Sequence, residues 1–244
     1  MSNQLAPKLL AEFIGTFALI FIGAGAAAVV GDGVGLNGIG AIAVAHGLTI
    51  MVFAFAYGNL SGAHFNPAVT VGVLAAGAIS VGEAVGYIVS QLVGGVAGAL
   101  LLLVVLGGVG TGLGTPQLAN GLALGATTVT ITPAAGFAVE AVLAFFLVTV
   151  VLNTAVAGRA GNLAPLAIGM TLTLNIIMGG ALTGAPFNPA RALGPMIATG
   201  KFADAWLYVL APIVGAIIAA WVHAGLTRMA RERTTAAGSA SAVG

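Results

Sequence analysis

Two copies of one short segment carry the residues with the most distinctive chemistry. The segment Ser61-Gly-Ala-His-Phe-Asn-Pro-Ala-Val-Thr70 returns as Thr183-Gly-Ala-Pro-Phe-Asn-Pro-Ala-Arg-Ala192, with the two asparagines 122 positions apart. Asparagine is a favoured N-cap, and a proline after it begins a helix without losing a backbone hydrogen bond. Each copy therefore predicts the start of a helix, with an amide group at that start.

The predicted helices begin at Pro67 and Pro189, each preceded by an asparagine, Asn66 or Asn188. A helix start carries roughly half a positive charge, and an asparagine amide can still donate hydrogen bonds beside it. Such a pair of helix starts disfavours cations and protons and leaves neutral solutes unaffected. A water molecule that accepts from both amides would turn its own protons away from its neighbours, which breaks the chain along which a proton would hop.

Two glutamates accompany the repeated motif. Glu12 and Glu140 lie 128 positions apart, each early in a long apolar stretch. An ionisable group in such a stretch costs roughly 2.5 to 3.5 kcal/mol on insertion scales, so both acids need partners. One interpretation is a proton relay. We favour a structural one, in which each carboxylate accepts hydrogen bonds from the backbone of the nearby motif loop, because the pair follows the repeat and has no relay neighbours.

The elements that must position these residues are membrane spans. The 244 residues are 59% apolar and 5% charged, with a mean hydropathy of +1.13, whereas a soluble domain carries about 25% charged residues. A helix needs about 20 residues to cross the hydrocarbon core. Six stretches qualify, and they are 9–30, 39–60, 83–106, 134–157, 163–182 and 204–227.

The motif segments 61–80 and 183–200 are broken by proline and too short to span, so they predict re-entrant half-helices. Irregular backbone at this depth is tolerated only where protein or a water-filled cavity surrounds it, which suggests a pore. Three spans per half make the repeat inverted, so the half-helices meet near mid-membrane. We expect an all-α membrane protein with one channel domain over 1–230, formed by repeats at about 8–106 and 133–228. The expected disordered cytoplasmic tail covers 231–244.

Charge sets the orientation and excludes several classes of protein. The net charge of +1 offers no field for nucleic acid, and without cysteine there is no disulfide, thiol nucleophile or thiolate metal site. We predict no catalytic residues, no metal and no cofactor. Under the positive-inside rule both termini are cytoplasmic in an integral protein of the cell (plasma) membrane. Lys201 flanks the outer side, and the inner side carries Lys8, Arg159, Arg228, Arg231 and Arg233.

The paired Asn-Pro-Ala motifs at 66–68 and 188–190, the second followed by Arg191, resemble those of the aquaporin, or major intrinsic protein, family. The likeness covers about residues 8–228, including Ala11-Glu-Phe-Ile-Gly-Thr-Phe17 and Gly194-Pro195. It implies an hourglass fold of six helices and two half-helices, assembled as a homotetramer in the lipid bilayer with a pore for water in each protomer.

The resemblance also assigns the residues of the pore. Asn66 and Asn188 would be central donors, and Arg191 would exclude cations at an outer selectivity filter. The other filter residues would be His46, Ile176 and Ala185. Backbone carbonyl groups that line the water file would come from Gly62, Ala63, His64, Gly184, Ala185 and Pro186.

This filter is similar to those of plant vacuolar-membrane aquaporins, some of which pass ammonia or urea. The glycerol-channel branch is a poorer match, because Ala192 and Met196 stand where that branch usually has Asp and a basic residue. Pro186 is a further departure from the family, which commonly has Gly or Ser there. We expect a passive water channel, with a channel for small neutral solutes such as ammonia, urea or glycerol as the alternative.

Other interpretations stay open at this point. Arg191 could anchor a helix end, His46 could be an ordinary core histidine, and His64 could form a pH-sensitive gate. We expect an interhelical hydrogen bond from Asn175. An ion channel would need a carbonyl filter or an acidic ring, a junctional protein would need long tails, and a secondary transporter would need alternating access. The sequence favours none of these three.

Overall fold

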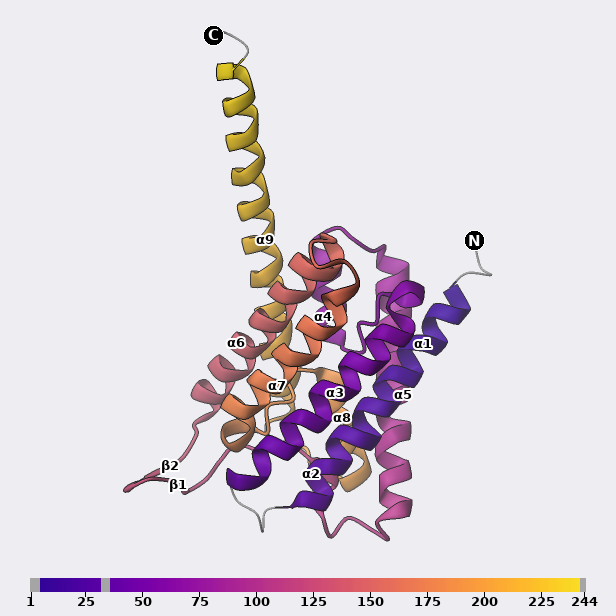
Figure 1. The fold of residues 1–244 in the computed structure, drawn as a ribbon. Coiled ribbons are helices and arrows are strands. Elements are labelled where there is room, and N and C mark those ends of the chain that lie inside the picture. The colour runs from indigo at the N-terminus through magenta and orange to yellow at the C-terminus, as the bar shows by residue number, and fades with distance from the viewer. Residues whose placement is uncertain (1–4, 32–35, 242–244) are drawn as a thin grey trace.

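The computed structural model describes residues 5–31 and 36–241. Its long helices form one bundle and run through it in alternating directions (Figure 1). Within these residues six helices are long and apolar enough to cross a membrane, as predicted. The first combines α1 (Leu5–Ala18), the π-helical turn η1 (Leu19–Ala24) and α2 (Gly25–Val30). The others are α3 (Leu36–Ser61), α5 (Val81–Val105), α6 (Pro133–Val151) with the π-turn η4 (Leu152–Val156), α7 (Ala164–Thr183) and α9 (Ala205–Ser241).

Two short helices begin at the motif prolines, as predicted. They are α4 (Pro67–Ala75) and α8 (Pro189–Thr199). The residue before each is extended, with φ of −156° at Asn66 and −152° at Asn188, and its side chain accepts from backbone N–H groups of the first turn. These are N-caps, and they satisfy donors that have no partner inside the helix.

The long helices pack in pairs, α3 along α7, α6 along α9 and α1 along α5. The short helices bridge the halves, since α4 lies against both α5 and α9 and so does α8. Close approach depends on small residues, among them two glycines of α5. A Cβ atom at Gly94 would lie 2.5 Å from the carbonyl oxygen of Phe13, and one at Gly98 would lie 2.8 Å from that of Phe17.

The connection between α5 and α6 contains short regular elements of its own. It holds the short turn η3 (Gly112–Gly114) and an antiparallel hairpin of β1 (Leu122–Leu124) and β2 (Thr127–Val129). Gly125 at the turn has a φ of +61°, which glycine adopts readily, and Thr and Val favour the second strand. The hairpin projects from the end of the bundle opposite the termini (Figure 1).

The tail over 231–244, which was predicted to be disordered, is helical as far as Ser241. α9 continues to Ser241 and extends beyond the bundle (Figure 1). Ala, Arg and Glu are good helix formers, and Arg228 Nε lies 3.0 Å from Glu232 Oε1 one turn away, which supports the continuation. Residues 242–244 lie outside the described part of the chain.

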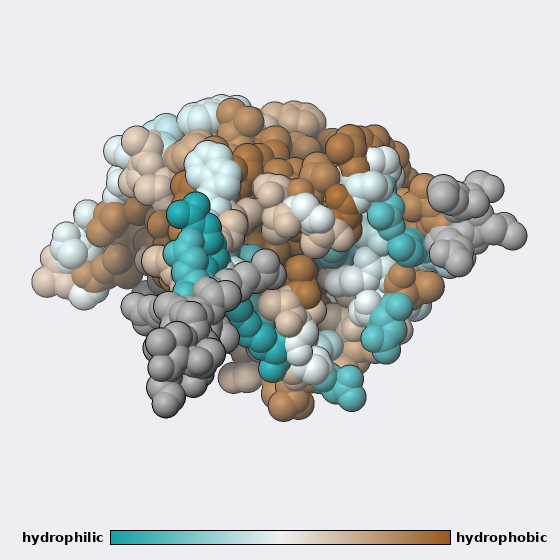
Figure 2. All heavy atoms as spheres, turned by 90° about the horizontal axis from the view of Figure 1, so that it is seen from above, coloured by the Kyte–Doolittle hydropathy of each residue, from teal (hydrophilic) through white to brown (hydrophobic). Residues whose placement is uncertain are grey.

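Both described ends of the chain lie at one end of the bundle (Figure 1). Figure 2 looks onto this end, where hydrophilic side chains gather among apolar ones. The alternation of the six spans puts Lys8, Arg159 and Arg228 here and Lys201 at the other end. Between the two ends large apolar side chains face outward, among them Val104, Trp221 and Val81. Such a belt suits contact with lipid.

Candidate functional site

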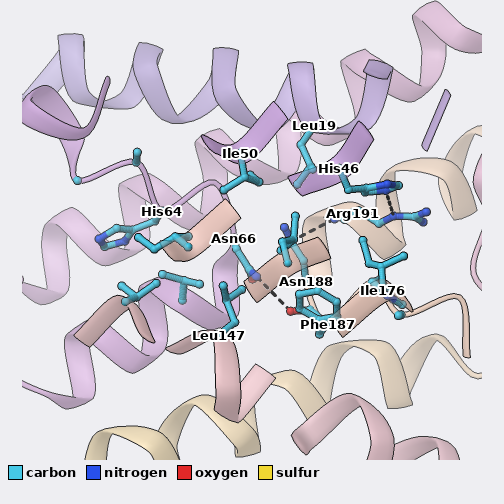
Figure 3. A pocket seen from close by; sticks show the side chains of 18 residues that line it. Leu19, His46, Ile50, His64, Asn66, Leu147, Ile176, Phe187, Asn188 and Arg191 are labelled. Atoms are coloured by element: carbon cyan, nitrogen blue, oxygen red, sulfur yellow. Dashed lines mark hydrogen bonds between the residues drawn. The ribbon is translucent and has the colours of Figure 1, made fainter. Parts of the chain in front are cut away.

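A narrow cavity lies inside the bundle where the two half-helices meet (Figure 3). Its volume of about 20 Å³ admits a water molecule with little room beside it. Both repeats contribute to its wall. The lining residues are Leu19, His46, Ile50, Gly62, Ala63, His64, Asn66, Val69, Leu147, Val151, Ile168, Leu172, Ile176, Ala185, Pro186, Phe187, Asn188 and Arg191.

The two asparagines face each other across the repeats (Figure 3). Asn66 Nδ2 donates to the carbonyl oxygen of Phe187 at 3.1 Å, and Asn188 Nδ2 donates to that of Phe65 at 2.9 Å. Each Oδ1 is occupied by N–H groups of its own helix start. An amide nitrogen has two hydrogens, so each asparagine retains one donor beside the cavity.

The loops before the asparagines have the same unusual backbone in both repeats. Positive φ values recur at Ala63 (52°) and Phe65 (48°) and again at Ala185 (41°) and Phe187 (29°). Non-glycine residues rarely adopt such angles, and they persist only where the surroundings hold them. The predicted carbonyl residues lie in the cavity wall with one exception. Gly184 is not part of the wall and packs against Pro116 of the connection between α5 and α6, called the outer connection below.

Glu12 holds the first loop from behind the cavity wall. Its Oε1 accepts from Ser61 Oγ at 2.6 Å and from the backbone N–H of His64 at 2.9 Å. Its Oε2 accepts from the backbone N–H of Phe65 at 2.7 Å and from Gln91 Nε2 at 2.8 Å. Each oxygen thus takes one backbone donor and one side-chain donor.

Glu140 holds the second loop with fewer bonds. Its Oε1 accepts from Thr183 Oγ1 at 2.6 Å, and its Oε2 accepts from the backbone N–H of Phe187 at 2.7 Å. Pro186 stands where the first repeat has His64 and has no N–H to give. The partners of both glutamates belong to the loops and their supports, which favours the structural interpretation over a proton relay.

Arg191 and His46 form one side of the outer part of the cavity, with Ile176 across from them (Figure 3). His46 Nδ1 lies 2.8 Å from the carbonyl oxygen of Ile42, which can only accept, so Nδ1 carries the proton. In the neutral ring Nε2 is then an acceptor, and it receives Arg191 Nε–H at 3.4 Å. The wall therefore offers the remaining guanidinium donors of Arg191, while the imidazole acceptor is already occupied by Arg191 itself.

Arg191 is also held from the outer connection, a contact the sequence did not reveal. Its Nη1 donates to the carbonyl oxygen of Gly114 at 2.6 Å. Gly114 has a φ of +67°, and a Cβ there would lie 2.5 Å from the carbonyl oxygen of Ala24. The preceding Leu113 is fully buried, also with positive φ. The outer connection thus packs closely against the first span, and the same residue of it binds Arg191.

Sequence reasoning also missed three supporting side chains inside spans. Tyr87 Oη donates to the carbonyl oxygen of Ser61 at 2.7 Å, and Tyr208 Oη donates to that of Thr183 at 2.8 Å. Gln91 is the third, through its bond to Glu12. A polar group within an apolar span is the signal that could have found them.

Two other residues singled out by the sequence, His64 and Asn175, make specific contacts in the structure. His64 Nδ1 lies 3.1 Å from Thr70 Oγ1, and its ring packs edge-on against Tyr87. Asn175 Nδ2 donates to the carbonyl oxygen of Leu143 at 2.8 Å, so the predicted interhelical bond is confirmed. Among residues 5–31 and 36–241 no group of three or more His, Asp or Glu side chains could hold a metal ion.

Comparisons with known proteins agree with this architecture. The sequence pattern of the family described as "Major intrinsic protein" matches residues 1–223. The chain is 40% identical over 219 residues to aquaporin NIP1-2 of Oryza sativa subsp. japonica, covering 88% of this chain and 70% of that protein. It is equally identical, over 224 residues, to glycerol uptake facilitator protein-like 6 of Lactiplantibacillus plantarum, covering 88% and 95%.

A solved structure, that of the aquaglyceroporin from Plasmodium falciparum, shares the fold with a TM-score of 0.74 at 24% identity. The match covers 89% of this chain and 94% of that one. Because an aquaporin and a glycerol facilitator-like protein are equally identical to the chain, overall similarity does not support the expected preference for the water-channel branch.

Proposed function

The chain belongs to the major intrinsic protein family, and from this membership and the geometry of the cavity we propose that it is a passive transmembrane water channel that excludes ions and protons. One observation carries the proposal. Two helix starts from opposite repeats meet at the cavity, each with an asparagine whose carbonyl oxygen is fixed to its helix and whose nitrogen keeps a free donor.

Water at this point accepts from Asn66 and Asn188, so both of its own hydrogens point along the cavity away from the centre. A proton that hops along a water file needs each water to accept from one neighbour and donate to the next. The central water donates in both directions, which interrupts the relay. The positive ends of α4 and α8 add a barrier to any cation, including a proton.

Arg191 supplies the second barrier. It is buried beside the cavity, and a fixed positive charge in a poorly solvated place repels cations more strongly than it would in water. Its bonds to Gly114 and His46 keep it in the wall.

A second candidate is conduction of small neutral solutes such as ammonia, urea or glycerol. Ile176 gives the filter an apolar side across from the donors of Arg191, and Ala185 adds a small apolar group to the cavity wall, which suits a solute with one polar and one apolar face. The name of the glycerol uptake facilitator-like relative points the same way.

We further propose a homotetramer in the cell (plasma) membrane with both termini cytoplasmic. The apolar belt around the bundle supports burial in lipid and against other protomers. The cationic side chains at the end shared by the termini support the orientation under the positive-inside rule. Chemical cross-linking in native membranes would give a four-membered ladder if the tetramer forms, and a monomer band alone would reject it.

Stopped-flow light scattering of liposomes tests the channel itself. Under an impermeant osmolyte the wild type should shrink fast, with a low activation energy, compared with empty liposomes. Asn188→Asp replaces the amide donor with a negative charge and should conduct little water. Asn59→Asp makes the same change at an exposed site at the end of α3 and should behave as wild type. Folded wild type no faster than empty liposomes would reject the water channel.

A further inference from the structure

The first span changes from α-helix to the π-turn η1 at the level of the filter. Such turns are rare and often occur at functional sites. Leu19 of this turn reaches the cavity wall, whereas Gly23 stays behind the wall and faces the ring of His46. A Cβ atom at Gly23 would lie 2.6 Å from Cδ2, 2.8 Å from Nε2 and 2.9 Å from Cγ of that ring. The ring therefore occupies the space that any side chain at position 23 would need.

The first span has no room to retreat from the ring. On another side it is already in backbone contact with α5, where a Cβ at Gly98 would lie 2.8 Å from the carbonyl oxygen of Phe17 and 3.3 Å from the backbone nitrogen of Phe21. A shift of the span would have to move α5 as well. Moving two packed helices costs more free energy than turning one side chain.

The ring of His46 can move in one direction. It is tethered through Nδ1 to Ile42, backed by Gly23 and bonded through Nε2 to Arg191. The remaining free space is the cavity, in whose wall both His46 and Arg191 lie (Figure 3). A methyl group at position 23 would therefore push the imidazole toward the middle of the filter.

We propose that Gly23 is a specificity-determining position: by having no side chain, it sets how far His46 projects into the filter and so the largest solute that passes. The inference rests on the proposed channel function, and it concerns a residue outside the cavity wall. Gly23 acts through His46 and touches no solute, so it is a positioning residue.

Liposomes with wild type, Gly23→Ala, His46→Ala and the double variant test this, with water and glycerol as probes. Gly23→Ala should lower the ratio of glycerol to water permeability about tenfold, a barrier difference of about 1.4 kcal/mol. If the wild type passes water but no glycerol, the water permeability of Gly23→Ala should instead be several-fold lower than that of the wild type. Gly40→Ala, a helix glycine whose added Cβ would meet nothing within 4 Å, should leave both unchanged.

The double variant separates the mechanism from a general loss of packing. If Gly23 acts through the ring, the double variant should have the permeability of His46→Ala alone. An equal effect of Gly23→Ala with and without the ring would overturn the proposal, as would an unchanged ratio in a folded Gly23→Ala protein. If Gly23→Ala does not fold, a folded double variant identifies the ring as the obstacle, and failure of both overturns the idea.

Failure of the channel function gives a different pattern. Wild type without water or glycerol flux would reject the proposed function but would leave the steric inference open to a direct measurement. A structure of Gly23→Ala at high resolution should show the His46 ring displaced into the cavity, toward the middle of the filter. An unmoved ring would overturn the inference whether or not the protein conducts.

Discussion

Replacing Glu12 by glutamine should destabilise the protein more than the same change at Glu140. Each oxygen of Glu12 accepts one backbone N–H, from His64 or from Phe65. Glutamine replaces one of those oxygens with an NH2 group. Whichever way its amide is turned, one buried backbone N–H loses its acceptor, at a cost of about 1–3 kcal/mol.

Glutamine at position 140 leaves no such orphan. Its carbonyl oxygen can keep the backbone N–H of Phe187, while its NH2 group donates to Thr183 Oγ1. That hydroxyl can turn to accept, and it already lies within 3.4 Å of the carbonyl oxygen of Gly179. Pro186 needs no acceptor, because it has no N–H. The two variants should therefore differ by about 2 kcal/mol, most of it from one unpaired donor.

Thermal unfolding in detergent, followed by the fluorescence of Trp206 and Trp221, measures this difference. About 2 kcal/mol corresponds to about 4–8 °C in midpoint for a chain of this length. Glu83→Gln is the control. It breaks a partly exposed pair with Lys8, which contributes about 0–1 kcal/mol.

The result that refutes this reasoning is a midpoint for Glu140→Gln equal to or below that of Glu12→Gln. A rescue variant adds a second check. His64→Pro removes the orphan donor and copies the residue found in the second loop, so it should recover part of the stability lost in Glu12→Gln. Failure to recover any would mean that the unpaired N–H is not the cause.

Arg191→Val should raise sodium or proton leak at least about tenfold in a liposome fluorescence assay, because the buried charge is removed; an unchanged leak would assign cation exclusion to the half-helix starts alone. Gly114→Ala should move the carbonyl that holds the arginine and raise the same leak to a smaller extent, whereas Gly110→Ala, which meets nothing within 4 Å, should not. Gly95→Ala should lower the folded yield in detergent, since its Cβ would lie 2.8 Å from a carbonyl oxygen in α8, and Gly82→Ala, with open space around it, should fold normally.

The spans and half-helices could be predicted because their signals are local. An apolar stretch of about 20 residues and an Asn-Pro start each act within one element. The pairing of Glu12 with its loop was also predictable in kind, since a buried carboxylate requires donors. Its exact donors were not, because the Gln91 bond joins residues 79 positions apart and depends on how α5 packs.

The contacts around the filter could not be read from the sequence. Gly114 lies in a glycine-rich connection with no periodicity, and its bond to Arg191 joins positions 77 apart. Gly23 resembles the many other glycines of the chain until the π-turn and the His46 ring are placed together. The prediction of disorder after residue 230 was wrong as far as Ser241, because it rested on the low apolar content of this segment and not on the helix propensity of its Ala, Arg and Glu residues.

The crossed bonds of the two asparagines also bear on how the protein is made. Asn66 and Asn188 each bond a carbonyl 121 or 123 positions away, so neither loop is complete until the other exists. At about 5–20 residues per second, the ribosome supplies the second loop roughly 6–24 s after the first. During that interval the first loop holds unpaired polar groups at membrane depth, where lipid cannot satisfy them. We therefore expect the first half to wait beside the translocon or a chaperone, and its release into lipid to follow synthesis of the second motif.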